Sequence, residues 1–326
     1  MSDRLTSIDA IKGLAIIFVL LLHSLSPEYL ERIYSTVHIG QAVPIFIAVT
    51  FFLSYLKLDK CMGSISSWYT KRNFIKLFHK VIFPYVLVLM LQCLILIAIG
   101  QLNVKHLVAS GGYGPGSYYI WIYVQIWLLA PILYKVLNCN FIYSSALILL
   151  VCIILNILCS YICPNFLWRL LSFRYIFLSV ISYIWIRGLA KFNFNRFLLV
   201  LLAALSLFYL VSNKVNFSPF VYVKSWTSQN YPVYFWTFVL INLLTGLINH
   251  LPFKLVRILC WLGQNSWQIF LSQMFVISFV SELPISNPAL SSIAYIVFVF
   301  TSSIGSVLFL KHLLTYTKSF ILRVHE

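Results

Sequence analysis

The chain of 326 residues is a succession of long apolar runs separated by short polar segments. Ten runs are long enough to cross, or nearly cross, a hydrocarbon layer of about 30 Å as a helix. They cover residues 8–25, 39–57, 81–100, 118–137, 141–163, 173–190, 197–213, 232–250, 258–281 and 290–310. The runs do not alternate apolar and polar residues as the strands of a membrane barrel do. The pattern therefore predicts an all-α, polytopic bundle of about ten transmembrane helices.

No polar linker, composition shift or internal repeat divides the chain, so we expect one integral-membrane domain over residues 1–326. Most Lys and Arg residues fall into alternate gaps between the runs, which the positive-inside rule assigns to the cytoplasm. This distribution predicts that both termini are cytoplasmic. The first run lacks a small-residue cleavage site, so we expect a retained span and not a signal peptide.

Composition excludes a soluble globular domain, because 61% of the residues are hydrophobic and only 9% are charged. The formal net charge of +16 is a common sign of nucleic-acid binding, but the charges lie mainly between the spans, as membrane anchoring requires. We therefore expect membrane lipid, and no nucleic acid, as a partner. The seven cysteines show no CxxC or zinc-finger spacing, so the sequence predicts neither a structural disulfide nor a metal site.

Three ionisable residues interrupt the first run: Asp9, Lys12 and His23. On a helix that turns about 100° per residue, Lys12 and His23 fall within about 20° of each other, and Asp9 within about 60° of Lys12. Asp9 also suits a helix start, and Lys12 can extend to the near interface. Neither explanation covers His23, and ionisable groups inside a span usually mark a functional site. We interpret the three residues as one polar stripe that forms the working surface.

The segment WYTKRNFIKLFHKVIFPY before the third span gathers positive charge at Lys71, Arg72, Lys76, His79 and Lys80. Lys76 and Lys80 are four residues apart and are expected to share a helix face. Such a cluster suits a clamp for a polyanion, for example the phosphates of a nucleotide. Anchoring at the cytoplasmic surface or contact with anionic lipid explains the same charges, and the sequence leaves both open.

Between the third and fourth spans, GGYGPGSYYIW predicts a tight extracytoplasmic turn. Its glycines let the backbone approach a ligand, and tyrosines offer ring faces and hydroxyls that suit sugars. Tyr113, Ser117, Tyr118 and Tyr119 are therefore candidate substrate contacts, although a plain re-entrant turn explains the segment equally well. Gln125 follows inside the fourth span, where a lone amide usually links helices.

Further polar candidates lie in the second half of the chain. Arg174 stands on the expected outer side, where it can pair with an acidic sugar or, more simply, with a carboxylate of the protein. In LGQNSWQIFLSQMFV, Asn265 or Ser266 suits a helix cap. Gln273 in the same segment is an intramembrane amide that needs a hydrogen-bond partner.

The pattern R-x₄-D-x₂-K-G-x₉-H in the first span resembles the signature of the membrane acyltransferase-3 family, which acylates cell-surface glycans. A basic residue, ten intervening residues and a histidine are met by Lys12 and His23. The segments KVIFPY, SYYIWIYVQIWLLAPIL and SWQIFLSQMFV also resemble the family in order and spacing, so the likeness covers nearly the whole chain. Two departures are the absence of an R-x-x-R pair in the basic loop and the presence of Gln273 where the family often has histidine.

The resemblance implies transfer of an acyl group, commonly acetyl, from cytoplasmic acyl-CoA to a hydroxyl of a surface polysaccharide or its lipid-linked precursor. It implies a multi-pass protein of a bacterial plasma membrane, with acyl-CoA as a donor substrate and no permanently bound cofactor. A sugar hydroxyl needs a base, and histidine is suited to that role at neutral pH, so His23 is the expected general base or, alternatively, a transient acyl carrier. Asp9 and Lys12 would organise the donor end of the stripe.

On the same basis Arg72, with Lys71, Lys76 and Lys80, would receive the CoA phosphates. Arg174 and the segment from Tyr113 to Tyr119 would face the acceptor. Two other functions stay open from the residues alone: a transporter or flippase for a lipid-linked sugar, in which the stripe is a substrate or proton path, and a polysaccharide polymerase. A polymerase usually needs a larger outer loop than this chain offers.

Overall fold

A computed structural model describes residues 3–61, 63–162, 169–188, 196–212, 228–280 and 293–309, and within these ranges the structure is entirely helical. The α-helices are α1 (Asp3–Ser24), α2 (Pro27–Arg32), α3 (Ala42–Lys60), α4 (Ile65–Trp68), α5 (Lys71–Leu77), α6 (Phe83–Ala98), α7 (Val104–Ser110), α8 (Tyr119–Cys139), α9 (Phe141–Ile162), α11 (Leu178–Arg187), α12 (Arg196–Ser212), α13 (Tyr234–His250), α14 (Phe253–Gln264) and α15 (Ser266–Phe279). Short 3₁₀ helices are η1 (Ser35–Val37), η2 (Ile39–Gln41), η4 (Phe173–Tyr175) and η8 (Tyr231–Val233). The segment η3 (Phe78–Ile82) is π-helical and joins α5 to α6.

The described residues contain six helical segments long and apolar enough to span a membrane. These segments are Thr6–Ser24, Ser35–Lys60, Lys71–Ala98, Tyr119–Cys139, Phe141–Leu158 and Tyr231–His250. Three shorter apolar helices are Phe197–Ser212, Ser266–Phe279 and Ile293–Phe309. The polytopic helical bundle is therefore confirmed, and six of the ten predicted runs form full-length candidate spans within the described residues.

Two of the expected spans have a different form. Residues 173–190 contain the turn η4 followed by α11, which has only 10 residues, in place of the one long span that the apolar run predicts. Residues 258–281 divide into α14 and α15 at Asn265, whose side-chain amide donates to the Trp261 carbonyl at 2.6 Å. Asn265 thus stands directly before α15, as a cap would, but its side chain bonds back to the preceding helix and leaves the start of α15 without a side-chain cap.

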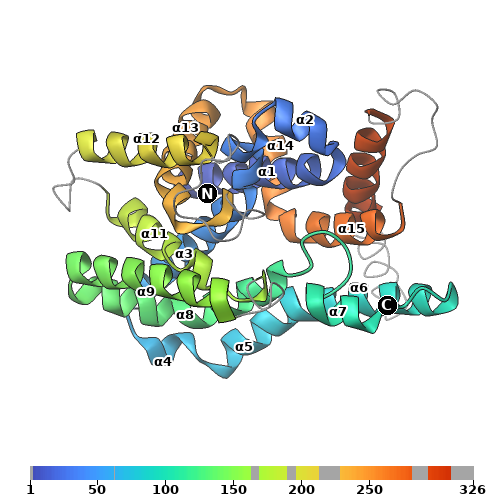
Figure 1. Cartoon of the computed structure of the whole chain (residues 1–326), viewed down its shortest axis with the longest axis horizontal. Helices are drawn as coiled ribbons and strands as arrows, with labels where there is room; N and C mark the ends of the chain where they lie inside the picture. The colour runs from blue at the N-terminus through green and yellow to red at the C-terminus, as the bar shows by residue number, and fades with distance from the viewer. Residues whose placement is uncertain are drawn as a thin grey trace, which may run out of the picture.

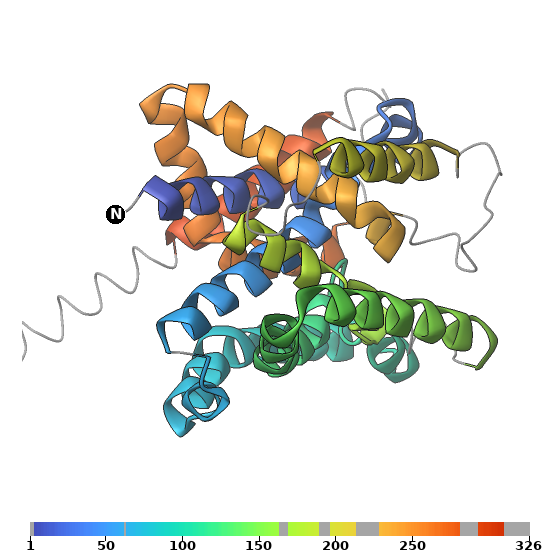
Figure 2. The same ribbon diagram turned by 90° about the vertical axis from the view of Figure 1, so that its left-hand side faces the viewer.

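Figure 1 shows two groups of helices, with α1, α2, α12, α13 and α14 above and α4 to α9 below. The helices α3 and α11 lie between the two groups, and the turned view in Figure 2 keeps the same division. Both central helices contact each other, and both contact α8 and α13. They therefore hold the two groups together.

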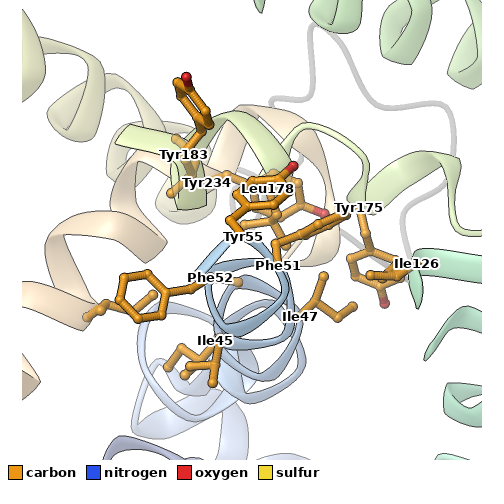
Figure 3. Close-up of a cluster of buried hydrophobic side chains, with 14 of the residues drawn as sticks. Ile45, Ile47, Phe51, Phe52, Tyr55, Ile126, Tyr175, Leu178, Tyr183 and Tyr234 are labelled. Atoms are coloured by element: carbon orange, nitrogen blue, oxygen red, sulfur yellow. The ribbon is translucent and has the colours of Figure 1, made fainter. Parts of the chain in front are cut away.

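The core of the protein surrounds α3, whose aromatic residues Phe51, Phe52 and Tyr55 are completely buried. Figure 3 shows these rings beside Tyr175, Leu178 and Tyr183 of η4 and α11. Burial of several aromatic side chains at one contact contributes strongly to stability, because each removes a large apolar area from contact with polar solvent. One side of α3 is therefore fixed by packing, which leaves the other side available for a cavity.

Polar residues at the C-terminal ends of α3 and α11 form what we call the Asp59 cluster: Asp59, Tyr134, Asn138, Tyr183 and Arg187. The Arg187 guanidinium donates to Asp59 at 2.7 Å and to the Tyr134 hydroxyl at 2.9 Å, and Tyr134 also donates to Asp59. The Tyr183 hydroxyl donates to Asn138 at 2.9 Å. The cluster joins α3, α8 and α11, which also pack on one another.

Long apolar faces of α6 and α9 remain exposed. Leu94 in α6 is 62% exposed and Ile142 in α9 is 75% exposed, and neighbouring Leu, Ile and Val side chains on both helices are similar. Exposed apolar faces of this length are what an integral membrane protein presents to lipid chains. The outer helices therefore face lipid, and polar groups collect inside the bundle.

Candidate functional site

A cavity of about 1250 Å³ lies between the two groups of helices and is lined by one face of each of three long helices. The lining residues that follow helical spacing are Lys12, Ile16, Val19 and His23 in α1, Val43, Phe46, Thr50, Leu53 and Lys57 in α3, and Tyr119, Tyr123 and Trp127 in α8. Steps of three or four residues place side chains on one face of a helix. From Val43 to Lys57 the lining covers about 21 Å along α3, most of the length of that helix.

His23 is close to the C-terminal end of α1 and faces the cavity. Its ring is half-buried and makes no hydrogen bond to any residue in the described ranges. Lys12 lines the same cavity about 16 Å away along the helix axis. The predicted alignment of Lys12 and His23 on one face of the first helix is therefore confirmed, and the histidine ring is available to a ligand in the cavity.

Asp9 lies just beyond the lining and bonds to two residues beside it. Its Oδ1 is 3.5 Å from the Lys12 ammonium, and its Oδ2 accepts from the Gln264 side chain at 3.0 Å. The carboxylate therefore connects α1 to the C-terminal end of α14, where Gln264 also lines the cavity. Lys12 has three N–H donors, of which this long contact uses one.

Glycine allows α1 and α14 to approach each other at this point. A Cβ atom added to Gly13 would overlap the carbonyl oxygen of Leu259, and one added to Gly263 would overlap the carbonyl oxygen of Asp9. Backbone therefore packs directly on backbone on both sides of the crossing. Gly13, which follows Lys12 in the sequence pattern, lets α14 come close enough for Gln264 to hydrogen-bond with Asp9.

The cavity has a cationic end, which we define by Lys12, Lys57, His79 and Lys80. Of the four residues expected to clamp a polyanion, Lys80 lines the cavity, whereas Lys71, Arg72 and Lys76 do not. Lys76 is exposed on α5 and does not line the cavity, and the π-helical segment Phe78–Ile82 begins between it and Lys80.

The opposite end of the cavity is polar. Its lining side chains come from η1, α7 and the segments beside η4 and η8: Ser35, Thr36, His106, Ser110, Arg169, Ser228 and Gln229. Among the described residues that line the cavity there are lysines, histidines and an arginine but no carboxylate. The cavity therefore offers positive potential to an anionic ligand and hydrogen-bonding groups to a polar one.

The glycine-rich turn contributes to this wall of the cavity. Gly111, Gly112, Gly114 and Gly116 all have positive φ, which a residue with a side chain adopts only with strain. The Gly111 carbonyl accepts hydrogen bonds from Tyr85 and Trp121, so the turn is fixed within the bundle. The residues Gly114 to Tyr119 line the cavity.

The candidate substrate contacts of this turn divide into two kinds. Ser117, Tyr118 and Tyr119 line the cavity, and Tyr118 donates to Gln229 at 3.4 Å. Tyr113 does not line it, because its hydroxyl is engaged with the backbone N–H and carbonyl of Asn103, both at 2.7 Å. The structure thus brings three of the four together and gives Tyr113 a place in the support of the turn.

Arg174 and Gln273 are completely buried and do not belong to the lining. The Arg174 guanidinium lies 4.6 Å from the ring centre of Tyr175 and 5.5 Å from that of Tyr118. Arg174 therefore contacts the wall of the cavity from behind. The Gln273 side-chain amide has no hydrogen-bond partner within the described ranges.

Gln125 confirms the expectation that a lone amide in a span links helices. Its Nε2 donates to the Leu170 carbonyl at 2.8 Å, and its Oε1 accepts from the Ser172 backbone N–H at 2.9 Å. Both contacts fix the segment before η4 against α8. Gln125 is therefore a structural residue beside the site.

Sequence reasoning did not place Lys57 or Trp68 in the site. Lys57 resembles any basic residue at a cytoplasmic helix end, and Trp68 lies in the four-residue helix α4, which has no periodicity that a sequence can show. The spacing of Lys57 from Val43, Phe46 and Thr50 was the one signal available, because it places the ammonium on the same face of α3. No cluster of three His, Cys, Asp or Glu side chains that would hold a metal ion occurs in the described part of the chain.

Comparison with known proteins gives a family for this architecture. No curated protein and no solved structure matches the chain at a significant level. A family model described as an acyltransferase domain matches residues 5–311, which is nearly the whole chain and includes every residue of the cavity lining named above. The protein therefore belongs to the acyltransferase 3 family of integral membrane acyltransferases.

Proposed function

We propose that the protein transfers an acetyl group from cytoplasmic acetyl-CoA to a hydroxyl of a cell-surface polysaccharide or of its lipid-linked precursor. The observation that supports this proposal is the cavity, whose lining combines the half-buried His23 with several lysines and with polar side chains. A two-substrate acyl transfer needs an anion-binding region for the donor and a polar region for the glycan. It also needs a base between them.

In the proposed reaction the hydroxyl oxygen of the acceptor attacks the thioester carbonyl of acetyl-CoA. The new C–O bond forms as the C–S bond breaks. Neutral His23 removes the hydroxyl proton and then gives it to the departing thiolate, so that the products are an acetyl ester and CoA as the free thiol. His23 is neutral again at the end of the cycle, as a general base and acid requires.

The donor is assigned to the cationic end. CoA carries several phosphate charges, which lysine ammonium groups bind through charge-assisted hydrogen bonds. Lys12 is oriented by Asp9, and Lys80 lines the same region. The absence of carboxylates from the described lining supports this assignment, because none opposes an anionic donor.

The acceptor is assigned to the polar end. Ser117, Tyr118 and Tyr119 offer hydroxyls and ring faces, which are the groups that commonly bind sugars. Arg174 would act indirectly, because its guanidinium lies beside the Tyr118 ring and outside the lining. Gln273 would likewise support the wall from outside.

The test uses a host strain without the gene, complemented with wild type, His23→Ala or His250→Ala, followed by mass spectrometry of the surface glycan. His250 is the control because it is exposed at the end of α13 and does not line the cavity. Loss of a general base commonly lowers a rate by about 10²- to 10⁴-fold. We therefore expect alkali-labile acetyl groups with wild type and His250→Ala but not with His23→Ala.

Full acetylation with His23→Ala would show that another group is the base. A different result, in which the deletion removes whole repeat units while the remaining glycan is normally acetylated, would replace acyl transfer with transport or polymerisation. Immunoblotting of membranes is needed in each strain to show equal amounts of protein.

A further inference from the structure

Lys57 is a cation of the cavity that the sequence pattern did not assign to the site. It lies in the last turn of α3, and its Nζ donates to the side-chain oxygen of Asn73 at 3.0 Å. The same ammonium lies 4.6 Å from the centre of the Trp68 ring. Both Lys57 and Trp68 line the cavity. Two residues from the α4–α5 region therefore hold this ammonium in one place.

Asn73 is itself held in a single orientation. Its Nδ2 donates to the backbone carbonyls of Ser67 at 3.1 Å and Trp68 at 2.8 Å. Carbonyl oxygens accept and do not donate, so the NH₂ group must face them and Oδ1 must face Lys57. Rotation of the amide by 180° would lose all three hydrogen bonds. The backbone carbonyls of α4 therefore fix Asn73 so that its acceptor, Oδ1, faces Lys57.

The partners of Lys57 orient its charge without neutralising it. An amide oxygen and an aromatic face both attract an ammonium, but neither carries a formal negative charge. Arg187, by comparison, is paired with the carboxylate of Asp59. A lysine that only anchors a helix to the membrane surface needs no such fixed partners. Two N–H donors of Lys57 remain for an anion that enters the cavity.

We propose that Lys57 binds a phosphate group of the acyl-CoA donor and that Asn73 is the positioning residue that holds its ammonium at the cavity. This inference rests on the proposed function, because it takes the donor as given and identifies the cation that receives it. It adds Lys57 and Asn73, which lie on two different helices, to the Lys80 that the basic loop already supplies.

The test measures binding of CoA to the full chain in lipid nanodiscs by isothermal titration calorimetry, which requires no knowledge of the acceptor. The variants are Lys57→Met, Lys57→Arg and Asn73→Leu, with Lys60→Met as the matched control. Lys60 lies in the same turn of α3, is also exposed and does not line the cavity. Pantetheine, the part of CoA that carries no phosphate, is the second probe.

We expect Lys57→Met to raise the Kd of CoA about tenfold or more, as loss of a charge-assisted hydrogen bond does. Asn73→Leu should raise it by a smaller factor, and Lys57→Arg should restore part of the affinity. Lys60→Met should bind CoA as wild type does. Binding of pantetheine should be the same in all variants, which a general loss of structure would not produce.

The double variant Lys57→Met/Asn73→Leu tests whether Asn73 acts through Lys57. Its Kd should equal that of Lys57→Met alone, because the amide has nothing left to position. If wild type binds CoA and Lys57→Met binds it equally well, the inference about Lys57 is wrong while the proposed function stands. If wild type does not bind CoA, the proposed donor itself is wrong. Should Lys57→Met fail to fold, Asn73→Leu retains the charge and carries the same prediction.

Discussion

Two acid–base pairs in the described part of the chain have similar exposure but very different surroundings. The side chains of Asp9 and Lys12 are 20% and 22% exposed, and those of Asp59 and Arg187 are 28% and 22% exposed. The first pair is a long contact of 3.5 Å within one helix and borders the cavity. The second is a contact of 2.7 Å between α3 and α11, and Tyr134 of α8 bonds to both partners.

The difference teaches which charges are available for function. In the Asp59 cluster both the carboxylate and the guanidinium have several partners, and none of its residues lines the cavity. Lys12, by contrast, has Asp9 as a partner at 3.5 Å and lines the cavity. A bundle of this kind uses saturated pairs to join helices and loosely paired cations to meet a ligand. Exposure alone would not have separated the two.

Among the variants that test this comparison, Lys12→Met should have the largest effect, because it removes the loosely paired cation and keeps most of its volume. We expect acetyl transfer to fall by about 10- to 100-fold, the loss of one charge-assisted hydrogen bond to the donor. The melting temperature followed by tryptophan fluorescence should change little, because the contact with Asp9 is long. A large fall in the melting temperature would mean that this pair is structural and that the contrast with the Asp59 cluster fails.

Gly263→Ala tests whether the Asp9–Lys12 pair depends on the close contact of α1 and α14. The new Cβ would overlap the Asp9 carbonyl, and such overpacking costs about 1–3 kcal/mol. Both transfer activity and melting temperature should therefore fall. Gly246→Ala is the control, because no atom lies within 4 Å of a Cβ at that position. Equal activity and equal melting temperature of the two variants would show that α1 and α14 can move apart without loss of function or stability.

Asp59→Asn should lower stability and leave activity unchanged, whereas Lys12→Met should lower activity and leave stability nearly unchanged. Asp59→Asn removes the charge opposite Arg187 in a partly exposed cluster, for which we expect a loss of about 1–2 kcal/mol and a fall of a few degrees in melting temperature. Transfer activity per folded molecule should be unchanged. Loss of activity without loss of stability would place the Asp59 cluster in the reaction.

Asp9→Asn should have the smallest effect. The amide keeps a hydrogen-bonding group beside Gln264 and loses only a long ion pair, worth less than about 1 kcal/mol at this exposure. We expect transfer activity within about fivefold of wild type. Complete inactivation, measured on protein of normal melting temperature, would show that Asp9 takes a direct part in the reaction and does more than orient Lys12.

Helical periodicity is sufficient to predict what lies on one helix. The common face of Lys12 and His23 follows from about 100° per residue, and the structure has both in the lining of the cavity. The linking role of Gln125 is likewise predictable, because an amide inside an apolar span must find partners. In both cases the outcome depends on local geometry that the sequence specifies.

What the sequence could not predict depends on contacts between segments far apart in the chain or on irregular helix geometry. No residue type indicates the π-helical turn after Leu77, and the sequence does not show that Lys80 lines the cavity whereas Lys76 does not. Lys57 joins the site only because Asn73, sixteen residues later, folds back onto it. The family resemblance implies that Arg174 faces the acceptor, but its guanidinium packs against the rings of Tyr175 and Tyr118. An apolar run also does not reveal where a helix breaks, as at Asn265 between α14 and α15.

The basic lining of the cavity also bears on the electrical insulation of the membrane. A hollow that follows α3 for about 21 Å shortens the distance over which lipid and protein oppose ion flow. Positive charge along such a path repels sodium, potassium and hydronium ions, as fixed cations do in the selective pores of channels. A carboxylate in the lining would attract these ions and help them to cross. Lysines in the lining would therefore oppose a leak of cations through the hollow.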